Sequence, residues 1–190
     1  VGLAVAIERY VYLSKTAVSN QALWKKITPF IQAGKFAEAA TVTSKSNAAI
    51  GSILTYGLDR SRTSTRRDDI EKAMEESLME VMPRLESRTH YLATFANIAT
   101  LLGLLGTIIG LIQAFTAVAE ANPAEKADLL SASISVAMNT TAFGLIVAIP
   151  LLFVHTVLQS KTTRIIDSLE MVSVKFLNAV DERRRQQPAA

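Results

Sequence analysis

Hydrophobic and polar residues alternate along this chain in long blocks. Two blocks contain no Lys, Arg, Asp or Glu, and they cover residues 89–119 and 129–160. Each is longer than the roughly 20 apolar residues with which a helix crosses the core of a bilayer. The pattern therefore predicts two complete membrane-spanning helices, the second and third of the fold, joined by a short loop of residues 120–128.

A shorter apolar block opens the sequence. Residues 1–7 are apolar, and they end at the polar pair Glu8-Arg9. Because a segment this short cannot span a membrane, we predict that residues 1–13 are the end of a first transmembrane helix whose beginning lies outside this sequence. The alternative is the start of a helix that is buried in a soluble protein.

The region between the first and second spans has an aqueous composition. Residues 14–88 are predicted to form a cytoplasmic helical region, because apolar positions recur there at helical spacing. Its expected parts are short helices at 20–32, 35–45 and 47–58 and a polar loop at 60–65.

Two amphipathic segments are expected to extend the complete spans. One helix should begin at Thr65 and continue without a stop into the second span, with a kink at Pro83. Residues 161–190 should form a helix that pairs with it and ends in a solvated tail containing residues 183–185. The predicted fold class is an all-α membrane protein with three transmembrane helices, whose long second and third helices extend into a cytoplasmic helical bundle.

Basic residues set the predicted orientation. Residues 10–88 contain 12 Lys and Arg and residues 161–190 contain six, whereas the loop 120–128 contains one. Because Lys and Arg favour cytoplasmic segments, we predict that the loop is periplasmic and that the other two segments are cytoplasmic. The net charge of +3 is too small to indicate nucleic-acid binding, and the absence of cysteine excludes disulfides and thiol chemistry.

Each complete span carries a stripe of small residues on one helix face. The stripe of the second span consists of Gly103, Gly106, Gly110 and Thr107. The stripe of the third span consists of Ser133, Ala137, Thr141, Gly144 and Ala148. Smooth faces of this kind favour close helix packing in a membrane, and we expect the glycine face to join neighbouring chains in an oligomer.

The hydroxyls on the two stripes lie at matching depths. Thr107 is 12 residues before Ala119, and Thr141 is 12 residues after Leu129. Polar groups within a membrane normally face other helices or a water-filled path. Two interpretations therefore stay open: dry packing, in which each threonine bonds its own backbone, or the lining of a pore.

Neither span contains a charged side chain that could act in catalysis or bind a metal. Neither contains a carboxylate, and the two histidines, His90 and His155, lie toward the predicted cytoplasmic ends, where interfacial positions are expected rather than metal ligation. The sequence has no Ser/His/Asp grouping and no phosphate-binding Gly loop. We therefore expect no catalytic residue, no metal and no cofactor, and the chain is not expected to be an enzyme. Any titrating acid on a proton path would belong to another chain.

Two motifs resemble the signatures of a known family. Residues 102–110, LGLLGTIIG, resemble the second-span signature of the ExbB/TolQ/MotA proton-channel family, in its ExbB/TolQ branch. Residues 140–150, TTAFGLIVAIP, resemble the third-span signature, and Ile7-Glu8-Arg9 resembles the end of the first span.

The resemblance implies a multi-pass protein of the bacterial inner membrane. It implies a homopentameric ring around the single spans of an ExbD/TolR-like dimer, with lipids around the ring and a TonB/TolA-like protein as a further partner. The partner dimer would carry the titrating aspartate. The residues expected to line the proton pathway are Thr107, Asn139, Thr140 and Thr141. The residues expected to pack the helices are Gly103, Gly106, Gly110, Gly144 and Pro150.

One position departs from the family pattern. Many members carry a glutamate five residues before the third-span threonine, where this chain has Val136. An intrinsic ring of channel glutamates is therefore not expected.

The predicted function is a ring-forming subunit of a proton-driven motor that acts through its partner, and the alternatives are a non-conducting scaffold or a small-solute transporter. Neither span has the broken helices or the charged midplane groups that are typical of transporters.

Overall fold

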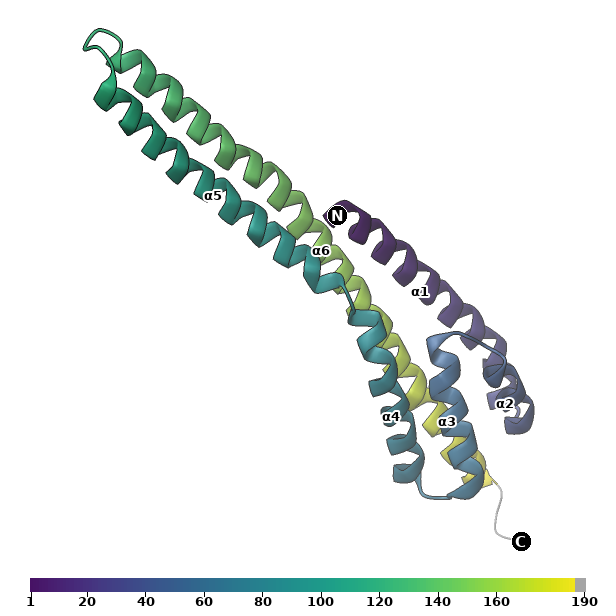
Figure 1. Ribbon diagram of the computed structural model, residues 1–190. Coiled ribbons are helices and arrows are strands. Elements are labelled where there is room, and N and C mark those ends of the chain that lie inside the picture. The colour runs from purple at the N-terminus through teal and green to yellow at the C-terminus, as the bar shows by residue number, and fades with distance from the viewer. Residues whose placement is uncertain (187–190) are drawn as a thin grey trace. The chain divides into compact units, whose positions relative to one another are not determined.

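The computed structural model describes residues 1–186, and these residues form six α-helices without a strand among them. In chain order the helices are α1 (Gly2–Gln32), α2 (Phe36–Ser44), α3 (Ala49–Thr63), α4 (Arg67–Glu86), α5 (Thr89–Glu120) and α6 (Lys126–Gln186) (Figure 1). The prediction of an all-α protein is confirmed. The predicted segment of residues 187–190 lies outside the described residues.

The chain is divided into two compact units. Unit 1 consists of residues 1–8 and 88–157, and unit 2 consists of residues 9–87 together with the chain from Leu158 onward. Helices α1 and α6 contribute residues to both units.

Unit 1 contains the two apolar blocks of the sequence, in α5 and in the first part of α6. Both blocks are long and apolar enough to cross a membrane, and only 11% and 17% of the residues in an apolar 18-residue stretch of each are buried. The core helix of a soluble protein is mostly buried, so the exposure of these blocks fits a lipid surface. Two membrane-crossing helices therefore agree with the prediction, and the third, at residues 1–13, stays a prediction.

Small residues form the interior of unit 1, and large ones lie outside. Phe115, Phe143 and Phe153 are 63%, 69% and 71% exposed, whereas Ala137 and Ala148 are 1% and 2% exposed. This distribution is the reverse of a soluble core. It is typical of membrane helices, whose association depends on close backbone approach rather than on the burial of large apolar side chains.

Glycines bring α5 and α6 into backbone contact. A methyl group added at Gly144 would lie 2.7 Å from the carbonyl oxygen of Ala99 and 3.0 Å from the Cα atom of Gly103. Added methyl groups at Gly106 and Gly110 would lie 2.5 Å from the Thr140 hydroxyl and 2.7 Å from the Ala137 Cβ atom. The glycine face of α5 thus contacts α6 of the same chain, and its contact with neighbouring chains stays a prediction.

Unit 2 has a conventional apolar core. Its helices bury large side chains, including Leu13, Ile27, Ile53, Leu58, Ile70, Met74, Leu169 and Phe176. The Phe36 ring of α2 meets the Phe176 ring of α6 edge to face, with 6.4 Å between the ring centroids. Helix α3 packs against α2 and α4. The buried residues of α1, α3, α4 and α6 recur at helical spacing, as expected for amphipathic helices.

The predicted continuous helix from residue 65 to residue 119 is wrong. Helix α4 passes through Pro83 and ends at Glu86, where the Ser87 N–H donates to the Pro83 carbonyl at 3.0 Å, and Arg88 has a left-handed backbone with φ of 62°. The last carbonyls of α4 have another donor: the Arg9 guanidinium, which is 2% exposed, donates to the Arg84 and Leu85 oxygens. A buried cation at a helix C-terminus satisfies carbonyls that have no partner within the helix.

The boundaries of α1 and α3 also differ from the prediction. Residues 2–13 and 20–32 belong to one helix, which ends at Gln32. Gly34 follows with φ of 75°, the left-handed conformation that glycine adopts readily. Helix α3 continues through the predicted polar loop to Thr63. The Arg184 guanidinium donates to the carbonyls of Ser61 and Ser64, at 3.2 and 2.9 Å, and so stabilises the longer helix end.

Residues 183–185 are therefore part of α6 and not of a solvated tail. Arg183 donates to the carbonyl of Gln32, the last residue of α1, just as Arg184 does at the end of α3. These two side chains join the C-terminal ends of other helices to α6. A cation interacts favourably with the unpaired carbonyls of a helix C-terminus, so these contacts stabilise the ends of α1 and α3.

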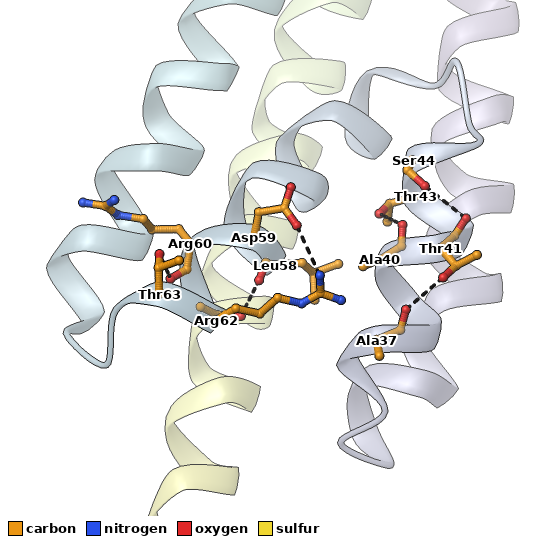
Figure 2. Close-up of polar contacts among 11 residues, drawn as sticks. Ala37, Ala40, Thr41, Thr43, Ser44, Leu58, Asp59, Arg60, Arg62 and Thr63 are labelled. Carbon is orange, nitrogen blue, oxygen red and sulfur yellow. Dashed lines mark hydrogen bonds and ion pairs between the residues drawn. The ribbon is translucent and has the colours of Figure 1, made fainter.

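Hydroxyl groups in α2 and α3 bond within their own helices. Figure 2 shows Thr41, Thr43 and Ser44 donating to carbonyls one turn earlier, and Thr63 doing the same in α3. The ion pair in this view, between Arg62 and Asp59, is long at 3.8 Å and solvent-exposed. The hydrogen-bonding capacity of these groups is satisfied within their own helices, so we do not consider them as part of a functional site.

The N-terminus of α3 receives its cap from another helix. The N-cap residue Ala48 has no side-chain acceptor, but the Asn20 side-chain oxygen of α1 accepts from the Ile50 N–H at 3.2 Å. Asn20 is 4% exposed. The amide therefore connects α1 to α3 and satisfies one of the donors that a helix start leaves unpaired.

We expect Asn20→Ala to lower the free energy of unfolding by about 1–2 kcal/mol, because it leaves the Ile50 N–H buried and unpaired. Asn20→Asp is the matched control, since it keeps the acceptor oxygen at a helix N-terminus. Guanidinium unfolding followed by fluorescence of the single tryptophan, Trp24, would report the loss. Equal losses in the two variants would contradict the capping role.

We expect Gly144→Ala to destabilise unit 1 by about 1–3 kcal/mol, because the added methyl meets backbone atoms that cannot move separately from α5. Gly2→Ala is the control: its methyl would lie 2.8 Å from Leu151 Cδ2, the flexible end of a side chain. Thermal unfolding in detergent, followed by helical circular dichroism, compares the two. If Gly144→Ala is as stable as Gly2→Ala, the backbone contact is not required.

Candidate functional site

The candidate site is a pair of hydroxyls between α5 and α6. The Oγ1 atoms of Thr107 and Thr141 are 2.9 Å apart, and both side chains are half-buried. The pair lies next to the Gly103 backbone, because the Thr141 hydroxyl also lies 3.0 Å from the Gly103 carbonyl oxygen. The structure thus brings together two threonines that the sequence placed at matching depths, and the backbone contact of the glycines makes this approach possible.

The two hydroxyls have more acceptors than hydrogens. Thr107 Oγ1 lies 2.8 Å from the Leu104 carbonyl oxygen, in addition to its contact with Thr141. Each hydroxyl donates one hydrogen and accepts through its oxygen. Thr107 can therefore donate to Thr141, which donates to the Gly103 carbonyl, or Thr141 can donate to Thr107, which donates to the Leu104 carbonyl.

The hydrogen-bond chain can accordingly run in either direction. Reversing it requires only the rotation of two hydroxyl groups, and neither group changes its charge. The sequence identified both threonines but not the two acceptors. The acceptors are backbone carbonyls, which carry no residue-specific signal.

The other two predicted pathway residues lie on a groove beside this pair. Asn139 and Thr140 are exposed and line a groove of about 570 Å³ whose remaining lining is small or apolar and includes Gly106 and Phe143. Neither Thr107 nor Thr141 lines it. The predicted pathway residues are therefore divided between a hydroxyl pair and a neighbouring groove.

The two polar side chains of the groove differ in their bonding. The Thr140 hydroxyl donates to the Ala137 carbonyl of its own helix at 2.7 Å. Among residues 1–186 the Asn139 amide has no hydrogen-bond partner. An amide exposed on a membrane-crossing helix is costly unless another group pairs with it, so a further helix that pairs with Asn139 in the groove would stabilise unit 1.

The residues that were predicted to pack the helices differ in their burial. Gly103 and Gly144 are buried at the contact of α5 and α6, and Gly106 and Gly110 are half-buried there. Pro150 is exposed on α6, which continues through it without interruption. Its role in packing stays a prediction.

No charged group lies near the hydroxyl pair in sequence, since the spans contain no Lys, Arg, Asp or Glu. The described residues include no group of three or more acidic or histidine side chains that could hold a metal ion. His90 packs against the Tyr91 ring, with 4.3 Å between centroids. The arrangement can accept, donate and reorient hydrogen bonds, but it cannot itself take up a proton near neutral pH.

Comparisons with known proteins point to one family. Residues 45–171 match the sequence model of the MotA/TolQ/ExbB proton channel family. The chain is 28% identical over 173 residues to a biopolymer transport protein ExbB homolog of Methanothermobacter thermautotrophicus, which covers 90% of this chain and 60% of that protein.

Two further relatives are similar to shorter parts of the chain. The Tol-Pal system protein TolQ of Haemophilus influenzae is 32% identical over 50% of this chain and 41% of its own length. The biopolymer transport protein ExbB of Aquifex aeolicus is 31% identical over 57% of this chain and 70% of its own length. The chain therefore spans less than two thirds of the Methanothermobacter and Haemophilus proteins. The family match over most of the chain, with these relatives, shows that the protein belongs to the MotA/TolQ/ExbB proton channel family.

Proposed function

We propose that this chain is the ring-forming subunit of a proton-driven motor in the bacterial inner membrane. It would couple proton flow to mechanical work through a single-span partner dimer similar to ExbD or TolR, and through it to a TonB/TolA-like protein. The observation that carries the proposal is the pair of hydroxyls, 2.9 Å apart, between the apolar blocks 89–119 and 129–160, which contain no charged residue.

The hydroxyl pair suits a role in solvating a proton. A hydrogen-bond chain that can run in both directions can face either a protonated or an ionised acid, because it can present a lone pair or an O–H group. The pair itself does not titrate, so the acid belongs to the partner. Neutralising and recharging that acid would change which helix contacts are favourable, and this change would drive relative movement.

The groove with Asn139 supports a complex rather than a single chain in lipid. Its apolar walls can receive a helix, and its free amide needs a hydrogen-bond partner within the membrane. We assign the groove to contact with the partner's span. Val136, 63% exposed, lines this groove where many relatives carry glutamate, so the chain would offer no acid of its own there.

The proposed topology has three spans and no enzymatic role. Residues 1–13 would complete a first span, residues 14–88 and 161–190 would lie in the cytoplasm, and residues 120–128 would form the periplasmic loop. Five copies would form the ring, with lipids around it. The charge contrast between the loop and the C-terminal segment supports this orientation.

We expect Thr107→Val and Thr141→Val each to lower proton-dependent activity by about tenfold or more, because a hydrogen bond to a charged group contributes about 1.5–3 kcal/mol. The double change should add little, since the two hydroxyls form one chain of hydrogen bonds. The measurement is proton flux in liposomes that contain this chain and its partner, with complex assembly measured beside it.

Thr116→Val is the matched control for these variants. Its hydroxyl bonds only the Ile112 carbonyl of the same helix, at 2.9 Å, and the side chain is exposed. Full flux in an intact complex that lacks both Thr107 and Thr141 hydroxyls would defeat the proposed path and favour the non-conducting scaffold.

We expect cysteines introduced at Ala124 and Ala37 to react with an impermeant reagent from opposite sides of the membrane. The chain contains no cysteine, and both positions are exposed. Ala124→Cys should label in intact spheroplasts, and Ala37→Cys only after permeabilisation. Labelling of both from one side would overturn the proposed topology.

A further inference from the structure

Unit 2 contains an apolar groove with an acidic rim between α4 and α6. The groove has a volume of about 410 Å³ and contains Met74, Met79 and Val174, with Glu71, Glu75 and Glu170 also in its lining. Met79 and Val174 are 68% and 49% exposed. We call this surface the acidic groove.

The acidic groove carries uncompensated negative charge. Among residues 1–186, none of its three glutamates has an ion-pair partner, and no basic side chain lines the groove. The surrounding helix adds to this charge, because α4 contains seven Asp and Glu against three Lys and Arg. An occupant should therefore be apolar at its centre and basic at its margins.

The exposed face of α1 in unit 2 has the opposite character. Val11, Lys15, Val18, Ala22, Lys25 and Lys26 are all exposed and, at steps of three and four residues, lie on one side of the helix. Val11 and Val18 are 58% and 68% exposed. Between Arg9 and Gln32 the helix contains four basic residues and no acidic one. We call this surface the lysine face.

The positive charge of the lysine face is also uncompensated. None of its three lysines has an ion-pair partner among residues 1–186. Lysine side chains can lay their apolar stems beside an apolar stripe while the ammonium groups reach outward. A helix with Val18 at its centre and lysines beside it thus matches a groove with methionines at its floor and glutamates beside them.

We propose that the acidic groove of one copy binds the lysine face of α1 in a second copy. The inference rests on the proposed ring-forming role, and it adds the surfaces that would join one subunit to the next. Groove against groove and face against face would each bring like charges together, so the groove of one copy pairs with the face of another. When a copy uses these two surfaces on two different neighbours, the contact is heterologous, and such contacts repeat head to tail into a ring or a filament.

Cysteine cross-linking tests this pairing in membranes that contain the full chain. Val18→Cys and Met79→Cys, placed on separate copies and mixed, should form a disulfide-linked dimer on oxidation, whereas each variant alone should form little. The control pair is Tyr56→Cys with Met79→Cys, because Tyr56 is 48% exposed and belongs to α3, not to the lysine face of α1. A chain with both Val18→Cys and Met79→Cys should give a ladder of linked species, whose last rung gives the number of copies if the ring closes.

Charge reversal tests the electrostatic part of the contact. Lys15→Glu with Lys25→Glu on one copy, or Glu75→Lys with Glu170→Lys on the other, should each lower the yield of linked dimer by about tenfold, since like charges then oppose each other. Combining the two reversed copies should restore most of the yield. Failure of the reversals to change cross-linking would contradict the proposed complementarity.

Three other results would each overturn the inference, and they separate its failure from that of the proposed function. A complex that is oligomeric by mass but shows no link between positions 18 and 79 would leave the ring in place and refute these surfaces. A lysine-face reversal that weakens only binding to anionic lipid vesicles would assign that face to the membrane surface. A chain that stays monomeric beside its partner would refute the ring itself.

Discussion

The contact between the backbones of α5 and α6 is the constraint on which unit 1 depends. It exists because Gly103 and Gly144 leave no side chain between the helices, and an added methyl at Gly144 would lie 2.7 Å from a carbonyl oxygen. In lipid, the burial of large apolar groups does not drive helices together, so close packing and interhelical hydrogen bonds must do so. The Thr141 hydroxyl, 3.0 Å from the Gly103 carbonyl oxygen, contributes such a hydrogen bond.

The same contact creates the candidate site. Two threonines on helices at ordinary separation could not share a hydrogen bond directly, but here their hydroxyl oxygens are 2.9 Å apart. Packing and chemistry are therefore coupled: the glycines set the distance, and the distance makes one hydrogen-bond chain out of two local ones. The alternative of dry packing and the alternative of a pore lining share this geometry. They differ in whether a proton-carrying partner meets the pair.

The two units follow different packing rules, because they fit different solvents. Unit 1 buries alanine and glycine and exposes phenylalanine, whereas unit 2 buries residues such as Phe176 and Met74. In unit 2 the helix ends are satisfied by polar side chains from distant parts of the chain, among them Asn20, Arg9 and Arg184. In charged caps of this kind, the carbonyl oxygens that the guanidinium binds replace the water that it loses on burial. The acidic groove and the lysine face carry exposed charges that no cap uses.

The sequence by itself determined the helical class, the two long apolar segments and the pairing in depth of Thr107 with Thr141. These features depend on local composition and on helical periodicity, which act through neighbouring residues. The sequence also marked the glycine stripe as a contact surface, although it did not identify α6 of the same chain as the partner. A helix face of small residues indicates that another helix packs closely against it, but it does not indicate which helix.

Only the tertiary structure decided where the helices end. The break at Ser87-Arg88 and the extension of α3 to Thr63 depend on guanidinium groups that bind carbonyls 75 or more residues away in the sequence. Arg9 follows an apolar block and Arg184 lies in a basic run, and neither context indicates a helix cap. The acceptors in the candidate site are the Gly103 and Leu104 carbonyls, and they could not be predicted from the sequence for the same reason. Every residue has a carbonyl group, so only the fold determines which of them meets a distant donor.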